Sequence, residues 1–573
     1  MAVIGIDLGT TNSIATYVDK NGEIIIIPDV SNGLLVPSCV GLDDDKNTIL
    51  IGNSAKNRLV TKPDLTVSSF KRFMGTEKKY KLANKEFTPI ELSSLIIKYL
   101  CNNAKEYLNE EITEAIISVP AYFDDNGRNA TKIAGQLAGI KVERIINEPS
   151  SAALAYRNNK QEESKYIVFD FGGGTLDISI VETFENIIEI SAVSGDNHLG
   201  GNDIDKAIFE YFCNENNLDI NDLNPKIIAI LMNLAEKTKI SLNDQTEVTM
   251  SYVVNERECN AIFTNSKLVE ICAFIFERIK KVIVHALHDC PYGLDEFSGV
   301  IMVGGSSKMK SIQGYIVSIL GLPILNEIEP NLVVAIGAGL VSGIKERKEQ
   351  LKDFILTDVC PFSLGVDILN PANPKIPLFS PVIQRNTSLP ASIEKSYTTA
   401  SDFQEKMIFQ IYQGESIHAI DNLKLGELSI DVPRLKKGKV VCNVRLTYDI
   451  NGILEVDIEC ENTKEQKRKV ILNKNIMLTD EEIEEKKKEL SKIKIMPIDE
   501  EQNKIVIERI AKIYEEVPIN IRDDIESKYN EFLLALDTQD RLKIEKMRKR
   551  ISEYLDDIEQ SNNVIFNDRD YYA

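Results

Sequence analysis

The chain is predicted to be a multidomain protein in which a two-lobed α/β part precedes an all-β part and a final helical part. Three observations support this organisation. A strand–turn–strand motif near the N-terminus recurs after residue 165, the segment 359–474 alternates as short strands, and the apolar period becomes helical from residue 478. A length of 573 residues is compatible with about three or four domains.

The composition is typical of a globular protein, with 43% apolar and 27% charged residues. A net charge of −21 disfavours nonspecific nucleic-acid binding, which needs basic surface. The nine cysteines are scattered and include no C-x-x-C motif, which favours a reducing compartment. Neither a leader nor a run of about 18 apolar residues is present in the sequence, so we expect a cytoplasmic protein without a membrane partner.

The first motif is "GIDLGTTNS", residues 5–13, which follows an apolar run and leads into the alternating segment "IATYVD". A turn between two strands differs from the two commonest glycine-rich phosphate motifs, because both of those open a helix. Taken alone, such a turn is structural more often than functional, by roughly two to one.

The second motif, "YIVFDFGGGTLDISIVE", repeats the same order: apolar strand 166–169, turn 170–175 and alternating strand 176–181. Two such hairpins predict two related lobes that face one cleft. Glycines allow backbone N–H groups to approach phosphate oxygens closely. The "DFG" within this motif is not accompanied by the other motifs of a protein kinase.

Carboxylates next to these turns indicate a metal–phosphate site. Asp7, Asp170 and Asp177 offer acceptor oxygens for the water around a Mg²⁺ ion. The glycine-rich segments 195–205 and 300–309 are further places where backbone could approach a ligand.

A charged helix is expected over residues 233–244, with Glu236 and Lys239 on one face. The ordinary interpretation of such a charge run is a solvated helix surface, which needs no ligand.

Several long motifs resemble signatures of the DnaK-type 70 kDa heat-shock chaperone family. They include "IGIDLGTTNS", "SVPAYFDDNGRNATKIAG", "RIINEPSSAALAY", "VFDFGGGTLDISI", "GDNHLGGNDID", "VIMVGGSSKM", "ILTDVCPFSLGVDI", "IYQGES" and "YDINGILEVDI". The resemblance covers essentially the whole chain. Residues 71–120 and the junction after residue 356 are most similar to the HscC-like branch.

The resemblance implies a fold and four segments. The fold is an α/β actin-like (ribonuclease H-like) two-lobed ATPase domain, followed by a β-sandwich that binds peptides and an α-helical lid. The segments are a nucleotide-binding domain over 1–346, a helix end and apolar linker over 347–358, the sandwich over 359–475, and the lid with a C-terminal tail over 476–573.

The resemblance also implies the ligands of the first domain, namely ATP or ADP with Mg²⁺, and K⁺ as a further candidate ion. Residues implied to contact the nucleotide are Gly9, Thr10, Thr11, Asn12, Gly172, Gly173, Gly200, Gly201, Glu236, Lys239, Asn243, Gly304, Gly305, Ser306 and Lys308. Those implied to be catalytic are Lys71, which would orient the attacking water, with Glu148, Asp170, Thr175 and Asp177. Asp7 and Asp170 would hold the Mg²⁺ through water.

Communication between the domains is implied at two places. Pro120 and Arg128 match a relay that reports the nucleotide state, and Ile355, Leu356 and Asp358 belong to the linker. Three consecutive large apolar side chains in a linker are expected to dock in at least one state, because exposing each costs roughly 1.5–3 kcal/mol relative to burial.

The peptide groove is implied by matches within the β-rich segment. Leu369 and Ala400 would arch over the groove, and Tyr397, Met407 and Phe409 would form its apolar floor. Alternation alone favours ordinary core positions for these residues by about three to one. Asn451-Gly452 between two alternating runs predicts a hairpin.

The sequence departs from the family pattern at residues implied to lie near adenine and in the segment 71–120. Asn243, Lys308 and Asn331 replace residues that are usual in the family, so the affinity for adenine is expected to differ. Residues 71–120 are shorter than in typical members, which leaves the use of an exchange factor open.

The final segment is expected to be helical. Thr479 and Glu482 form a capping box, and Pro497 ends the helix that they begin.

The function that these motifs predict is an ATP-dependent chaperone that binds unfolded or extended polypeptides, with a J-domain co-chaperone as partner. Two alternatives remain open, a sugar-kinase-like enzyme and a protein that uses nucleotide only as a structural ligand. A zinc site at "HALHDC", residues 285–290, lacks an evident fourth ligand.

Overall fold

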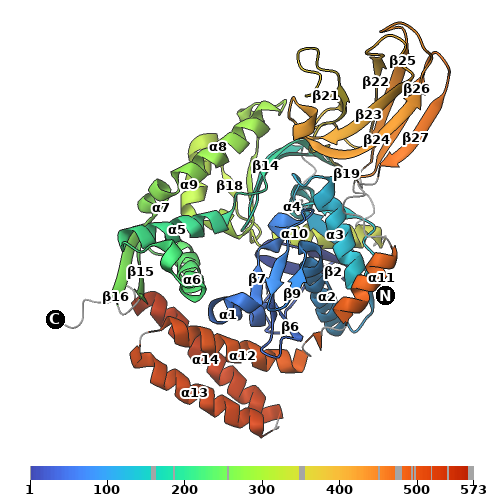
Figure 1. Cartoon of the computed structure of the whole chain (residues 1–573). Helices are drawn as coiled ribbons and strands as arrows, with labels where there is room; N and C mark the ends of the chain where they lie inside the picture. The colour runs from blue at the N-terminus through green and yellow to red at the C-terminus, as the bar shows by residue number, and fades with distance from the viewer. Residues whose placement is uncertain are drawn as a thin grey trace.

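The computed structural model describes residues 2–565 except 157–162, 185–186, 255–256, 347–354, 450–451, 472–479, 492–493, 496–497, 518 and 539–540. Figure 1 shows a two-lobed body, a β-rich part that projects from one end of it, and helices from the C-terminal end of the chain beneath the body.

The two lobes are built around sheets of the same topology. The first sheet has the order β11-β10-β1-β2-β3 and the second has the order β18-β17-β12-β13-β14-β19. In each, three antiparallel strands joined by hairpins continue into two parallel strands. The repeated hairpin motif therefore belongs to two related sheets, as the sequence predicted. Their strands are β1 (Ala2–Asp7), β2 (Asn12–Val18), β3 (Ile24–Ile27), β10 (Ile112–Val119), β11 (Ile145–Asn147), β12 (Ser164–Phe171), β13 (Leu176–Phe184), β14 (Ile187–Asp196), β17 (Gly299–Val303), β18 (Ile324–Leu325) and β19 (Ile355–Thr357).

Two helices pack together between the sheets, α4 (Glu148–Tyr156) and α10 (Val333–Lys345). They approach each other closely because both carry small residues. A Cβ atom on Gly337 would lie 1.9 Å from the carbonyl oxygen of Ser151, and one on Gly5 of β1 would lie 2.3 Å from the backbone nitrogen of Gly339. The close contact therefore requires glycine at these positions.

Outer elements complete the lobes. On the first lobe they are β4 (Val36–Pro37), β5 (Cys39–Leu42), β6 (Thr48–Ile51), β7 (Thr66–Ser68), β8 (Tyr80–Leu82), β9 (Lys85–Phe87), α1 (Asn53–Thr61), α2 (Pro89–Leu108) and α3 (Asp125–Ala138). On the second lobe they are α5 (Gly201–Glu215), α6 (Pro225–Ser241), β15 (Glu247–Val254), β16 (Arg257–Thr264), α7 (Asn265–Ile271), α8 (Ala273–His288) and α9 (Lys310–Leu320). Short 3₁₀ turns lie at Pro63–Leu65, Phe70–Phe73, Ile220–Asp222, Leu294–Glu296, Gly305–Lys308 and Ala419–Asp421.

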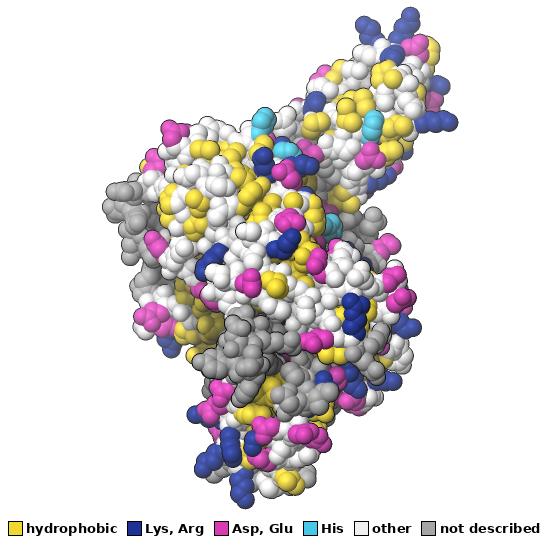
Figure 2. Space-filling view, turned by 90° about the vertical axis from the view of Figure 1, so that its left-hand side faces the viewer, with side chains coloured by type: hydrophobic (Ala, Val, Ile, Leu, Met, Phe, Trp, Pro, Cys, Tyr) yellow, Lys and Arg dark blue, Asp and Glu magenta, His cyan; other side chains and the backbone are white. Residues whose placement is uncertain are grey.

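The all-β part consists of two four-stranded sheets, β21-β20-β23-β24 and β22-β25-β26-β27, which enclose one apolar core. Its strands are β20 (Leu364–Ile368), β21 (Leu378–Ile383), β22 (Ala391–Thr398), β23 (Lys406–Gln413), β24 (Leu423–Asp431), β25 (Val441–Tyr448), β26 (Leu454–Cys460) and β27 (Gln466–Ile471). The predicted hairpin joins β25 to β26, with Gly452 at φ 78°, whereas Asn451 lies outside the described residues. In Figure 2 this part protrudes from the body, with Lys and Arg side chains gathered at its far end.

Among the described residues, the sandwich is followed by four helices: α11 (Asp480–Ser491), α12 (Ile498–Glu516), α13 (Ile519–Asp537) and α14 (Arg541–Ile565). The last three share an apolar core that includes Ile513, Ile525 and Phe532. Between α11 and α12, the short strand β28 (Lys494–Ile495) pairs with β6. Thr479 of the expected capping box and Pro497 lie outside the described residues. These helices lie against the two-lobed body and away from the sandwich (Figure 1).

Candidate nucleotide site and its connections

A cavity of about 290 Å³ lies between the two lobes, and residues from both hairpin turns line it. Most of the residues predicted to contact nucleotide line this cavity: Gly9, Thr10, Thr11, Asn12, Gly172, Gly173, Glu236, Lys239, Asn243, Gly304, Gly305, Ser306 and Lys308. Lys71, Glu148, Asp7, Asp170 and Thr175 line it as well. The structure thus brings together residues that are far apart in the sequence.

The first turn is held by hydrogen bonds from a neighbouring loop. The hydroxyl of Ser38 donates to the carbonyl of Gly9 at 2.7 Å, and the N–H of Ser38 donates to the carbonyl of Thr11 at 2.8 Å. A Cβ atom on Gly9 would lie 2.0 Å from the carbonyl oxygen of Asn12, so glycine is required there. The tight turn leaves Thr10 and Thr11 facing the cavity.

The second turn is braced by the start of α5. The N–H groups of Gly201 and Asn202 donate to the carbonyls of Gly172 and Gly173, each at 2.9 Å. A Cβ atom on Gly200 would lie 2.4 Å from the backbone nitrogen of Gly174. Gly200 and Gly201 are not among the cavity-lining residues, so their part is to support the turn that lines it.

A buried ion pair lies among the residues that line the cavity. The Lys71 ammonium is 2.8 Å from Glu148 Oε1, and the two residues are 4% and 7% exposed. The hydroxyl of Ser118 donates to Asp7 at 2.8 Å. The charge-assisted hydrogen bond between Lys71 and Glu148 holds both of these side chains in one geometry.

The carboxylates beside this pair are crowded and buried. Burial, followed by the charge of Glu148, raises the pKa of Asp7 to about 6, and the same two causes raise the pKa of Asp170 well above its usual range. Carboxylates that repel one another in a buried site are suited to a divalent cation, which would restore the ionised form of both. The donor set therefore fits Mg²⁺.

Asp177 lies behind the turn and not among the cavity-lining residues. One of its oxygens accepts the N–H of Tyr122 at 3.0 Å, and within the described part of the chain the other has no hydrogen-bond partner. Burial, with Glu148 nearby, raises the pKa of Asp177 to about 7. The group can therefore exchange a proton near neutral pH.

Residues of α6 and of the turn after β17 also line the cavity. Lys239 is paired with the buried Asp205 at 2.7 Å, and exposed Lys308 is paired with Glu329 at 2.9 Å. Further lining residues include Leu35, Asn202, Ile240 and Met309. Of these four, only Leu35 lies outside the segments that the sequence pattern had singled out. Ile240 directly follows Lys239 on the predicted charged helix, and this adjacency was the only signal for it.

The predicted relay lies at the junction with the sandwich. The guanidinium of Arg128, on α3, donates to Asn147 Oδ1 at 2.7 Å and to the carbonyl of Ala121 at 3.2 Å. Pro120 directly precedes Ala121, and the Pro120 carbonyl accepts the N–H of Phe123.

The sandwich contacts the body through buried polar groups that the sequence pattern had not indicated. Asp125, in the first turn of α3, accepts the Tyr448 hydroxyl at 2.6 Å and donates its own N–H to Gln413 at 3.0 Å. Asp289 is paired with Arg385 at 2.7 Å. The rings of Tyr122 and Phe362 are 4.4 Å apart. These contacts link the sandwich to both lobes.

The linker strand β19 forms the edge of the second sheet. It pairs with β14 in parallel, with Leu356 opposite Ile188, and the Leu356 side chain packs against the core between the lobes. The hydroxyl of Ser150 donates to Asp358 at 3.1 Å. Phe354 of the apolar run lies outside the described residues.

The predicted groove residues fall into two groups. Leu369 and Ala400 are exposed, whereas Met407 and Phe409 are 6% and 3% exposed within the sandwich core. Tyr397 packs edge-on against Phe409, with ring centres 5.7 Å apart.

The zinc alternative finds no support. His288 is exposed and Asp289 is engaged by Arg385. Among the described residues, no three or more His, Cys, Asp or Glu side chains are grouped so as to hold a metal ion. All nine cysteines are free. In the part of the chain that the structure describes, none of the helices is long and apolar enough to span a membrane.

The fold and the cavity define a two-lobed nucleotide-binding protein that carries a β-sandwich and a set of C-terminal helices. Comparison of the sequence with known proteins agrees with this description of the fold. The model of the Hsp70 protein family matches residues 3–567. The chain is 32% identical to the chaperone protein DnaK of Thermosipho melanesiensis in an alignment that covers 98% of each chain.

The chain therefore belongs to the Hsp70 family, and it is an ATP-hydrolysing chaperone that binds unfolded polypeptides. Membership implies an actin-like ATPase domain, a β-sandwich and a helical lid, which agrees with the elements described above. The sugar-kinase alternative is set aside, because the family match extends through the sandwich and the final helices.

Proposed function

We propose that ATP turnover between the two lobes controls peptide release from the sandwich through the linker strand β19. The observation that carries the proposal is the pairing of β19 with β14, which makes the linker an edge strand of the nucleotide-binding sheet. A strand that is part of that sheet can respond to movement of the lobes, whereas a flexible tether cannot. Pro120 and Arg128 would transmit the nucleotide state to the sandwich, because they lie next to the Asp125 contact with it.

Within the cavity we assign Lys71 to the attacking water and Glu148 to the orientation of Lys71, a role supported by their 2.8 Å ion pair. Asp7 and Asp170 would hold Mg²⁺ through water, and Mg²⁺ would neutralise phosphate charge. Thr175 would contact the phosphate, and Asp177 would accept a proton.

The proposal also covers the finer features of the chain. The nucleotide-binding domain would span 1–346, the helix end and linker 347–358, the sandwich 359–475, and the lid with its tail 476–573. The peptide groove of the sandwich would be formed by Leu369, Tyr397, Ala400, Met407 and Phe409. A J-domain protein would be the co-chaperone, the cytoplasm the compartment and the HscC-like proteins the nearest branch. Free cysteines throughout the chain support a reducing compartment.

The variant Leu356→Asp tests the coupling. A carboxylate in place of the docked side chain disfavours docking of β19, since burying an unpaired charge is costly. In the wild type, an extended Leu-rich peptide should stimulate phosphate release without becoming phosphorylated, and ATP should speed peptide dissociation. In the variant, ATP and peptide should still bind, but both responses should be lost.

The matched control is Leu356→Met, which keeps an apolar side chain of similar volume and should retain both responses. Full-size responses in Leu356→Asp would show that the linker is only a tether. Phosphorylation of an added sugar by the wild type would instead revive the kinase alternative.

A further inference from the structure

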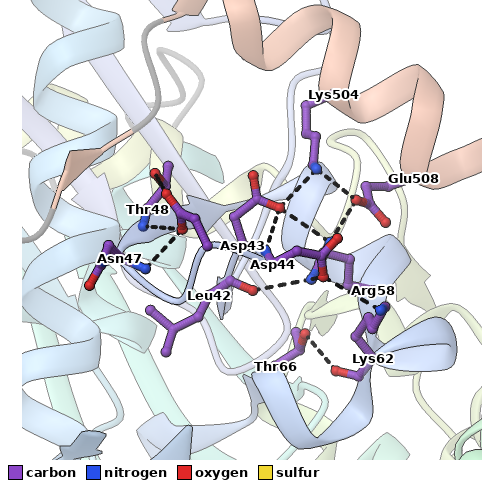
Figure 3. A network of polar contacts seen from close by, with 11 residues as sticks. Leu42, Asp43, Asp44, Asn47, Thr48, Arg58, Lys62, Thr66, Lys504 and Glu508 are labelled. Atoms are coloured by element: carbon purple, nitrogen blue, oxygen red, sulfur yellow. Dashed lines mark hydrogen bonds and ion pairs between the residues drawn. The ribbon is translucent and has the colours of Figure 1, made fainter. Parts of the chain in front are cut away.

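Helix α12 connects the C-terminal helices to the first lobe through buried charges (Figure 3). Arg58 of α1 is only 1% exposed, and its guanidinium donates to Glu508 of α12 at 2.8 Å. Lys504, one turn earlier on α12, is 2.8 Å from Asp43. A buried arginine paired with a carboxylate of another element is costly to separate unless both groups regain water.

The other end of the same helix contacts the second lobe. Glu516 accepts hydrogen bonds from Asn233 and Lys237 of α6, both at 2.6 Å, and its side chain is 4% exposed. Glu515 is 2.6 Å from Lys226, at the start of α6. Ile513 and Glu516 also enclose a small cavity of about 30 Å³ with residues of α6 and β15. One helix thus bonds to both lobes, and in Figure 1 it runs beneath α1 and α6.

This bridge lies next to the nucleotide cavity. The α6 helix carries Glu236, Lys239 and Ile240, which line the cavity, beside the bridged residues Asn233 and Lys237. Lys56 of α1 is 3.8 Å from Glu236. Burial opposes ionisation of Glu236, but Lys56, Lys239 and the α12 residue Lys512 keep its pKa below the usual value. The three helices therefore meet beside Glu236, which lines the cavity.

We propose that α12 is a clasp on the nucleotide cavity, which ties α1 to α6 and slows the release of bound nucleotide. The inference rests on the proposed nucleotide contacts of α6 and adds a positioning element from outside the two lobes. Separation of α1 from α6 beside Glu236 would require α12 to leave either Arg58 or Lys237. The C-terminal helices would thereby control how long nucleotide stays bound.

The test measures dissociation of a fluorescent ADP analogue from the full-length protein by stopped flow. Glu508→Ala removes the buried ion pair with Arg58 at the first lobe, and Glu516→Ala removes the buried contacts with Asn233 and Lys237 at the second. Each should speed dissociation about 10-fold or more, since loss of one partner of a buried ion pair acts mainly on off-rates. Detachment of α12 at either end is enough to open the clasp, so the two effects should add rather than multiply in the double variant.

Three further variants separate an effect of the clasp from general destabilisation. Glu531→Ala removes an ion pair within α13 and should leave the rate unchanged. The exchanged pair Lys237→Glu with Glu516→Lys should restore slow release, whereas Lys237→Glu alone should be fast. Unchanged rates in both clasp variants, or effects that multiply in the double variant, would overturn the clasp. Failure of the wild type to bind the ADP analogue would instead contradict the proposed nucleotide site.

Discussion

Replacement of Lys71 by Ala is expected to slow single-turnover ATP hydrolysis by about 10²-fold or more while ATP binding persists. The Lys71 ammonium is buried and held 2.8 Å from Glu148, and both residues line the cavity. A charge preorganised in this way need not be reoriented as the transition state forms, and its loss falls on the chemical step. Rapid-quench measurement of a single turnover, with ATP affinity determined separately, checks this expectation.

Loss of Lys71 also leaves Glu148 as an unpaired buried carboxylate, which could impair the fold rather than the chemistry. The double variant Lys71→Ala with Glu148→Gln removes that charge and serves as the control. It should regain thermal stability but not hydrolysis. Wild-type turnover in either variant would remove Lys71 from the mechanism.

The variant Glu501→Gln is expected to strengthen the docking of α12 at neutral pH. Glu501 is 3% exposed and lies against α1 and α2, where the titratable groups that face it are Asp29 and Tyr99. Burial, and then the charge of Asp29, raises the pKa of Glu501 to about 8 in the docked helix. Gln keeps the size of the side chain without the charge.

The pH dependence follows from the sign of this shift. Docking requires Glu501 to be protonated. In the undocked helix, Glu501 is protonated without a free-energy cost only below the ordinary carboxyl pKa of about 4.5. From there to about pH 8, docking weakens by up to about 1.4 kcal/mol per pH unit, and above pH 8 the loss stays constant. The variant loses this dependence, because Gln does not titrate.

Amide hydrogen exchange in α1 and α12 measures the effect, with variant and wild type compared at each pH so that intrinsic exchange rates cancel. Protection in the variant should exceed that in the wild type by a factor that grows toward pH 8. Glu531→Gln, on the surface of α13, is the matched control and should show no such difference. Equal protection at pH 5 and pH 8 in the wild type would exclude a docked, protonated Glu501.

Much of the candidate site was predictable because its signals are local. Thr10, Thr11 and Gly173 belong to turns whose glycines and flanking strands are specified within about ten residues, and the structure places these turns on opposite sides of one cavity. A Cβ atom on Gly173 would lie 1.9 Å from Thr11 Oγ1, which shows how closely the turns face each other. The repeated hairpin likewise predicted two related lobes, and the two sheets have the same strand order.

Other parts of the site left no local signal. Asp125 is one of several acidic residues near the start of α3, and only the folded chain reveals that it accepts the Tyr448 hydroxyl from a strand more than 300 residues later. Leu35 lines the cavity but lies outside every motif that the sequence offered. Contacts across such distances in the sequence depend on the packing of whole elements.

Local sequence was sufficient to predict the order of an α/β, an all-β and a helical part, and the two hairpin turns that line the cavity, because backbone preferences and apolar periodicity act over a few residues. The contact of the C-terminal helices with both lobes became visible only in the folded chain. Glu508 and Glu516 look like solvated residues of a charged helix, and their partners Arg58 and Lys237 lie 179 residues apart from each other in the sequence. Burial of these charges is a property of the assembled lobes, so no short segment of the chain could encode it.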